Sequence, residues 1–199
     1  MTSTHFVWIG LAALLVFWAV GAYNRLVRLK NTIANAFSQV DVHLKRRYEL
    51  IPLLVDAVEK YLCHDQAALE SVTLARNDAR HASDAVRSRP SSAKAVTRLS
   101  ATETALNGAL GRLRVLAESY PELKTDAIIE GLAKALTSTD NKMAFARQTY
   151  NDAVRDYNLA QGEFPAVVLA RLFGFGPSVM LQVMPNAEER QALRIQLQK

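Results

Sequence analysis

Hydrophobic residues recur every three or four positions along most of this chain. The pattern occupies four stretches, at residues 26–44, 54–86, 96–120 and 129–160. Apolar positions that repeat with a period of about 3.5 residues over several turns are typical of helices that pack along a shared seam. No segment of comparable length alternates with period two, so strands are not expected. The sequence therefore predicts an all-α protein.

Proline, glycine and serine separate these stretches and place the helices at about 25–47, 52–86, 92–119 and 125–162. Short connections favour antiparallel neighbours, and hence an up-down four-helix bundle. Pro52 leaves two interpretations of the first boundary. It suits the first turn of a new helix, and it could instead kink one very long helix.

Three positions on the predicted seams are not apolar, namely Asp65, Glu103 and Thr139. On one interpretation they form a buried polar cluster that binds a ligand or a metal inside the bundle. On the other, which we favour, they lie at the edges of the seams or fix the helix register through one paired polar contact.

The beginning of the chain differs from the rest. Phe6 begins and Tyr23 ends an 18-residue stretch without a formal charge, which as a helix is about 27 Å long and close to the hydrocarbon thickness of a bilayer. Trp8 and Tyr23 lie near its two ends, as interfacial aromatic residues often do. We interpret this stretch as a transmembrane anchor. A cleaved secretory signal is the alternative, but the preceding residues lack its basic region.

Charge gives the anchor a predicted orientation. Arg25, Arg28 and Lys30 follow the span directly, and no basic residue precedes it. The positive-inside rule then places the N-terminus outside and the remainder in the cytoplasm. The lone Cys63 is compatible with a reducing compartment and excludes an intramolecular disulfide.

Composition excludes several classes of protein. The chain has 199 residues, a net charge of +5, and only 8 glycines and 6 prolines, which argues against a sandwich, a barrel or a disordered chain. No Glu-x-x-His pair, nucleophile motif or phosphate-binding loop occurs, so we expect no catalytic residue, no cofactor and no metal. The densest basic run, at 45–47, is interpreted as a solvated helix end, and no nucleic-acid partner is expected.

Several motifs in order resemble the LemA family. They are Tyr23-Asn-Arg-Leu-Val-Arg-Leu-Lys-Asn31, Val40-Asp-Val-His-Leu-Lys-Arg-Arg-Tyr-Glu-Leu-Ile-Pro52, the stretches 61–65 and 73–76, Thr139-Asp-Asn-Lys-Met-Ala-Phe-Ala-Arg147, Tyr150-Asn-Asp-Ala-Val-Arg-Asp-Tyr-Asn158, Phe164-Pro165 and Phe173-Gly-Phe175. The resemblance spans about 20–177. It departs from the family at Leu53, where Asn is usual, and at Asp65 and Asp140, where Glu is usual.

The resemblance implies an N-terminally anchored membrane protein with an antiparallel four-helix bundle and no established catalytic activity. It also suggests a protein partner, with a membrane-bound metalloprotease as one possibility. We therefore divide the chain into an anchor at 1–24, a bundle at 25–163 and a C-terminal segment at 164–199.

An up-down bundle predicts which residues face the membrane. We expect the lipid bilayer to contact a group of basic side chains, which are Arg25, Arg28, Lys30, Arg76, Arg80, Arg87 and Arg89. The apolar segment 167–175 emerges at the same end. It either lies in the membrane interface as a second anchor or folds back over the end of the bundle.

Two functions follow from these expectations. The first is a non-catalytic, membrane-anchored scaffold or adaptor. The second is a ligand- or metal-binding sensor that uses Asp65, Glu103 and Thr139.

Overall fold

The computed structural model describes residues 2–62 and 65–182, and within them every regular element is a helix. The helices are α1 (Thr2–Glu59), α2 (Gln66–Ser88), α3 (Ala93–Ala117), α4 (Pro121–Thr125), α5 (Ala127–Gly162) and α6 (Ala166–Leu172). The described part of the chain holds no strand, which confirms the predicted all-helical class.

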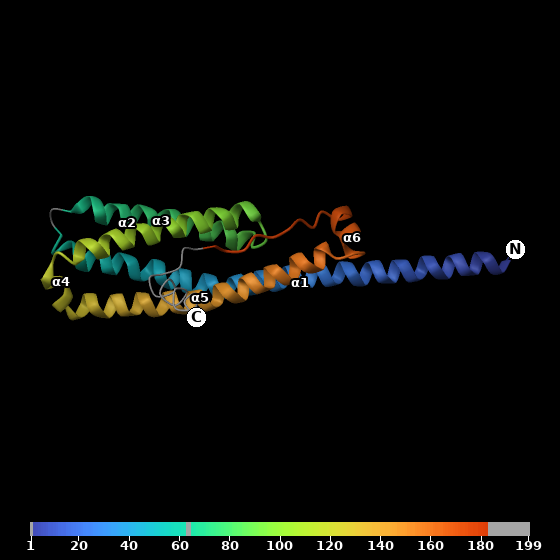
Figure 1. The fold of residues 1–199 in the computed structure, drawn as a ribbon, viewed down its shortest axis with the longest axis horizontal. Helices are drawn as coiled ribbons and strands as arrows, with labels where there is room; N and C mark the ends of the chain where they lie inside the picture. Colours follow the sequence, from blue (N-terminus) through green and yellow to red (C-terminus); the bar gives the residue numbers. More distant parts are fainter. Residues whose placement is uncertain (1, 63–64, 183–199) are drawn as a thin grey trace, which may run out of the picture.

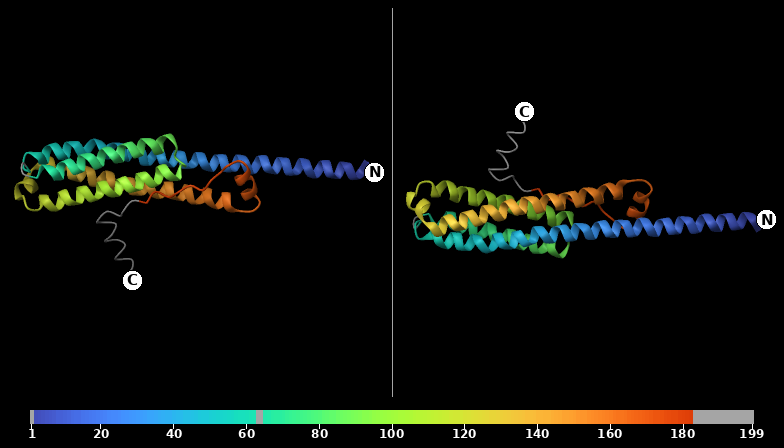
Figure 2. Two further views of the ribbon diagram at one scale, coloured as in Figure 1. Left: turned by 90° about the horizontal axis from the view of Figure 1, so that it is seen from above. Right: turned by 90° about the horizontal axis from the view of Figure 1, so that it is seen from below.

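Helix α1 has two parts with different surroundings (Figure 1). Its first part projects beyond the rest of the molecule in all three views (Figures 1 and 2), and its second part lies among the other helices. Of the described helices, α1 is the one that is apolar enough over 18 residues to cross a membrane, with a mean hydropathy of 2.1 and none of that window buried. Its 58 residues make it about 86 Å long.

Residues 26–62 and 65–162 form what we call the helical body. Within it α1 packs against α5 and α2, and α2 packs against α3, with the chain reversing direction between successive long helices. One hydrophobic core runs through all four long helices. Its buried seam residues include Ile33, Phe37, Val72, Leu99 and Tyr150, as the spacing predicted.

Of the two interpretations of Pro52, the one that begins a new helix there is wrong, and the one that places Pro52 inside a long helix agrees with the structure. Pro52 lies inside α1, which continues to Glu59, and α2 begins only at Gln66. Pro52 does not end α1, because Arg76 of α2 contacts α1 at this point, as described below. Elsewhere the boundaries agree closely with the sequence pattern, and Asp126 caps α5 by accepting hydrogen bonds from the amides of Ile128 and Ile129.

The chain turns back after α5. Helix α6 covers the end of the helical body through Ala170, which is buried against Leu26 and Ala160. An extended segment, residues 175–182, then returns along α5 (Figure 1). The structure thus bears out the fold-back of 167–175, whereas its contact with a membrane stays a prediction.

Candidate functional site

A buried arginine lies at the centre of a polar network in the helical body. The side chains of Arg47 on α1 and Glu103 on α3 are each 1% exposed, and the Nη1–Oε2 distance between them is 2.5 Å. The Nε atom of Arg47 is 3.1 Å from Oδ1 of Asp140 on α5. Its Nη2 atom donates to the side-chain oxygen of Asn107. One guanidinium therefore joins three helices.

Tyr48 completes the network on the adjacent position of α1. Its hydroxyl donates to Oε1 of Glu103 at 2.5 Å, so both carboxylate oxygens of Glu103 are engaged. Burial and the neighbouring carboxylate of Glu103 raise the pKa of the Tyr48 hydroxyl far above its usual range. Tyr48 is consequently neutral and acts as a hydrogen-bond donor at any physiological pH.

The geometry of this network suits structure better than chemistry. A nucleophile or a general base needs access to a substrate, and Arg47, Tyr48 and Glu103 are all buried. Among the described residues, no group of three or more His, Cys, Asp or Glu side chains could hold a metal ion. Paired and hydrogen-bonded charges in a core commonly specify register and partner choice among packed helices.

A second buried contact explains how α1 continues through Pro52. Proline has no N–H, so the carbonyl four residues earlier, that of Tyr48, lacks its usual helical donor. Arg76 on α2 supplies the replacement, with Nε at 2.9 Å and Nη2 at 2.6 Å from the Tyr48 oxygen. The guanidinium therefore satisfies the acceptor that Pro52 leaves free and ties α2 to α1 at that point.

Asp41 forms a second contact between α1 and α2. Its carboxylate accepts two hydrogen bonds from Arg87, at 3.0 and 2.8 Å, and one from the Ser83 hydroxyl at 3.3 Å, and Lys45 lies 3.0 Å away. Burial alone would raise the pKa of Asp41, but the bonds to Arg87 and Lys45 outweigh it and hold the pKa below its ordinary value. The carboxylate is therefore charged at neutral pH.

These contacts lie within motifs that known proteins share. The model of the LemA family matches residues 36–197 of this chain. The chain belongs to the LemA family. Magnetosome proteins MamQ 1 and MamQ 2 of Paramagnetospirillum magneticum (strain ATCC 700264 / AMB-1) are similar to it, each 29% identical over 80 residues. That match covers 40% of this chain and 29% of each MamQ protein, so the chain spans less than a third of the length of these curated relatives.

The residues of the Arg47 network and of the Arg76 contact belong to the LemA motifs. Arg47, Tyr48 and Pro52 belong to the motif at 40–52, Arg76 ends the stretch at 73–76, and Asp140 lies in the motif at 139–147. Motifs that are far apart in the LemA sequence therefore meet around a single segment of α1.

The three polar seam positions of this LemA chain have different hydrogen-bond partners. Glu103 lies in the Arg47 network, as described above. Asp65 accepts a hydrogen bond from the Tyr120 hydroxyl at 2.9 Å, and Thr139 donates to the Ala135 carbonyl at 2.8 Å. Tyr120 follows Glu103 by 17 positions, which corresponds to about 26 Å along a helix. Glu103 and Asp65 thus contact residues that are remote in sequence, whereas Thr139 bonds within its own helix. The register interpretation stays a prediction.

The predicted basic group is divided by the structure. Arg25, Arg28 and Lys30 are exposed on α1 just after the apolar stretch. Arg76 and Arg87 instead contact Tyr48 and Asp41 on α1, although the Arg87 side chain stays 44% exposed. Arg80 on α2 and Arg89 just after it are exposed.

The turn between α2 and α3 can be located along α1 through two contacts. The Tyr150 hydroxyl donates to the Pro90 carbonyl at 3.1 Å, and the Tyr150 ring contacts that of Phe37 at 5.9 Å between centroids. Phe37 follows Tyr23 by 14 positions, so this turn lies about 21 Å beyond the end of the apolar stretch. Contact of Arg76, Arg80, Arg87 and Arg89 with lipid stays a prediction that this placement does not favour.

Sequence reasoning missed a clamp on the C-terminal segment. Asn158 pairs twice with the backbone of Ser178, donating to its carbonyl at 2.8 Å and accepting from its amide at 2.9 Å. Asn151 makes the equivalent pair with Leu181, at 3.3 and 2.8 Å. A Tyr-Asn pair that recurs after seven residues, at 150–151 and 157–158, is the signal that could have revealed it, because seven residues are two helical turns.

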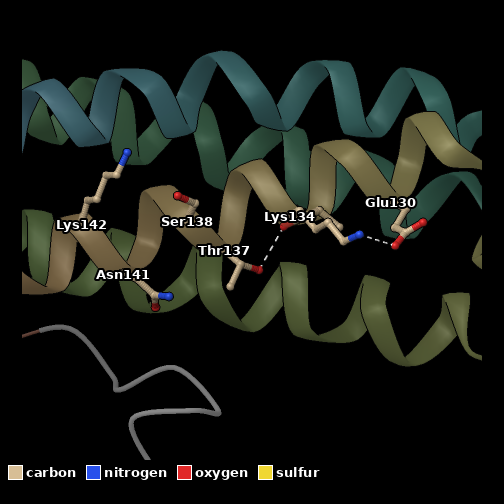
Figure 3. A pocket seen from close by; sticks show the side chains of 7 residues that line it. Glu130, Lys134, Thr137, Ser138, Asn141 and Lys142 are labelled. Atoms are coloured by element: carbon tan, nitrogen blue, oxygen red, sulfur yellow. Dashed lines mark hydrogen bonds and ion pairs between the residues drawn. The ribbon is translucent and has the colours of Figure 1, made fainter.

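A shallow hollow on the surface lacks the features of a binding site. It is lined by seven residues of α5 alone, six of which are labelled in Figure 3. Lys134 is engaged by Glu130 at 2.5 Å, and Thr137 donates to the Ala133 carbonyl at 3.0 Å. The side chains therefore bond along their own helix and do not converge on a point.

Proposed function

We propose that this LemA-family protein is a single-pass membrane protein whose cytoplasmic domain is an antiparallel, up-down four-helix bundle acting as a non-catalytic scaffold or adaptor. One observation carries the proposal. The exposed apolar stretch and the core helix of the body are parts of one helix, α1, with no break between them.

An exposed apolar helix needs an apolar environment. Large side chains from Phe6 to Val20 are mostly exposed and form a patch far larger than a soluble monomer usually carries. A bilayer covers such a stretch on all sides. Burying one large apolar side chain is worth about 1.5–3 kcal/mol, so the segment prefers lipid strongly.

Helical continuity supports the scaffold role. Because α1 does not end at the membrane surface, the body stands on the span as a rigid extension and not on a flexible linker. The Arg47 network and the Arg76 contact then fix the other helices against α1. Such an arrangement presents helix faces at a defined distance from the membrane, which is what an adaptor requires.

The body also offers surface for a partner. Phe145 and Leu159 on α5 and Leu74 on α2 are large apolar side chains that lie exposed. We propose that a protein partner uses such faces, and a membrane-bound metalloprotease stays a candidate because of the family resemblance alone. The sensor alternative gains no support, because Glu103, Asp65 and Thr139 each have a different hydrogen-bond partner. Within the described part of the chain, no group of three or more His, Cys, Asp or Glu side chains could hold a metal ion.

Extraction and a reporter test the proposal. We expect the full chain to sediment with membranes and to resist alkaline carbonate, and a variant lacking residues 2–24 to be released into the soluble fraction. A reporter fused after Lys199 should be active only when it is of a type that functions in the cytoplasm, because Arg25, Arg28 and Lys30 flank that side of the span. Activity of a periplasmic reporter at that position would refute the orientation.

A further inference from the structure

The end of the helical body nearest the apolar stretch carries a second apolar surface. Phe164 is 85% exposed and Leu172 is 75% exposed, and Val168 and Phe173 are also exposed. Val168 and Leu172 lie one helical turn apart on α6, and Phe164 lies in the turn that precedes it. Opposite them, Ala170 is completely buried. The segment thus has apolar side chains on both its buried side and its exposed side.

Aromatic contacts fix this segment at one level of α1. The Tyr23 ring lies 5.1 Å from that of Phe173 and 5.5 Å from that of Phe175, both edge to face. Lys30 lies over the Phe175 ring at 5.8 Å, and Arg25 approaches Glu163 at 3.9 Å. Tyr23 is the last residue of the uncharged stretch. The end of α6 therefore lies at the level where the apolar part of α1 ends, and the ribbon shows α6 beside α1 (Figure 1).

We propose that residues 163–175 form an interfacial collar on α1, seated in the headgroup region of the same bilayer that α1 crosses. The inference rests on the proposed anchor and adds a second, separate contact with lipid. Its partner is a lipid surface and not a protein, because the exposed apolar patch lies directly beside the end of the apolar stretch of α1.

Charge at the collar suits an anionic lipid surface. Within residues 23–30 and 163–175 the chain has four basic side chains, Arg25, Arg28, Lys30 and Arg171, against the single acid Glu163. All four basic side chains are exposed at this end of the body. Apolar side chains that insert beside basic ones are the usual composition of segments that bind at the headgroup boundary.

A cavity of about 340 Å³ lies between α1 and the α5–α6 turn. Trp18, Gly21 and Ala22 line it from α1, and Phe164, Pro165 and Ala166 line it from the other side, with Arg25 also among its residues. Its lining is mostly apolar, with the charged pair Arg25 and Glu163 at its edge, and a Cβ added to Gly21 would meet no atom within 4 Å. At the proposed depth this cavity would hold lipid methylene groups, with the Arg25 guanidinium placed for a lipid phosphate.

Depth-dependent quenching tests the collar in the full chain. Single cysteines are introduced as Leu172→Cys, Leu15→Cys or Phe145→Cys in a Cys63→Ser background and labelled with an environment-sensitive fluorophore. The proteins are reconstituted in phosphatidylcholine–phosphatidylglycerol vesicles. Quenching is measured with lipids that carry a nitroxide near the headgroup or in the acyl chain, and with aqueous iodide. Leu15 lies in the span, and Phe145 is an exposed apolar residue of α5 that serves as the matched control.

We expect the Leu172 probe to be quenched several-fold more by the headgroup nitroxide than the Phe145 probe, and several-fold less by iodide. If the Leu172 and Phe145 probes behave alike while the Leu15 probe is quenched by acyl-chain nitroxide, the collar is refuted and the anchor stands. If the Leu15 probe is quenched only by iodide, the anchor fails. If the Leu172 probe is then still quenched by the headgroup nitroxide, the collar is the membrane contact of this chain. If the Leu172 probe is not quenched either, both the collar and the anchor are refuted.

Discussion

Arg47 shows how one side chain can hold three helices in register. Its guanidinium reaches Glu103 and Asn107 on α3 and Asp140 on α5 while it is itself anchored on α1. Desolvating a charge is costly, so such a contact exists only where the opposite charges arrive from the correct turns of their helices. A shift of α3 by one turn would leave Arg47 and Glu103 buried without each other.

This reasoning predicts the effect of Glu103→Gln. Neutralising the carboxylate leaves the buried guanidinium with Asp140 as its remaining charged partner, and we expect the free energy of unfolding to fall by about 3 kcal/mol. Urea unfolding of the detergent-solubilised chain measures it. Glu130→Gln, on the exposed face of α5, is the control and should cost less than about 0.5 kcal/mol. Equal losses in the two variants would refute the role assigned to the network.

Asp41 predicts a pH dependence. Because its pKa is held below the ordinary 3.8, the folded state is stabilised above that value, and this stabilisation disappears as the pH falls through the lowered pKa. Asp41→Asn should therefore cost about 1 kcal/mol at neutral pH and progressively less as the solution is acidified below pH 4. Unfolding at a series of pH values checks this, with exposed Asp78→Asn as the control. A difference that does not change with pH would contradict it.

Sequence reasoning was most successful where the signal was periodic and local. The buried seam positions Phe37, Val86, Leu106 and Tyr157 follow directly from spacing. Arg47 was misinterpreted as part of a solvated helix end, because the carboxylates that justify its burial lie on helices remote in sequence. No local pattern distinguishes an arginine that will meet such partners from one that points into water.

At the scale of the element, α1 depends on a residue of another helix. The carbonyl of Tyr48 has no helical donor because residue 52 is a proline, and Arg76 takes the place of the missing N–H. The same reasoning explains why α1 does not end at Pro52 and continues to Glu59. A proline alone indicates a helix end, and only the tertiary contact shows that the helix continues.

A double-mutant cycle tests this dependence. Arg76→Met should destabilise the protein by about 1–3 kcal/mol, because it leaves the Tyr48 carbonyl buried without a donor. In a Pro52→Ala background the helix supplies its own N–H, so the same substitution should cost clearly less. We expect a coupling energy of at least about 1 kcal/mol from urea unfolding of the four proteins. Additive effects would show that Arg76 acts independently of Pro52.

The clamp on residues 175–182 gives a prediction for α5. Asn158→Ala removes both hydrogen bonds to Ser178, each worth about 1 kcal/mol net, and should expose the backbone of this segment to solvent. Hydrogen exchange should accelerate across 176–182 and little elsewhere. Asn141→Ala, at an exposed position of the same helix, is the control. Unchanged exchange in the Asn158 variant would mean that other contacts hold the segment.

At the scale of the whole molecule, the levels of the basic residues along α1 decide which of them can meet a membrane. Arg25 and Arg28 lie within two turns of Tyr23, whereas the α2–α3 turn lies about 21 Å farther on. The Debye length at physiological ionic strength is about 8 Å, so charges near that turn are screened from lipid headgroups. The formal charge of +5 is therefore a poor guide to membrane affinity, and position along α1 is the better one.

A charge comparison on residues 25–199 tests this. The core of the helical body begins at Leu26, so this part should fold without the apolar stretch. Each basic residue near the surface of an anionic membrane contributes about 1 kcal/mol. Replacing Arg25 and Arg28 by Gln should thus weaken binding to phosphatidylglycerol vesicles roughly 30-fold, and replacing Arg80 and Arg89 should change it little. Vesicle co-sedimentation measures both pairs at physiological salt. Equal losses would mean that the α2–α3 turn also reaches the lipid and that the body lies along the membrane and does not stand away from it.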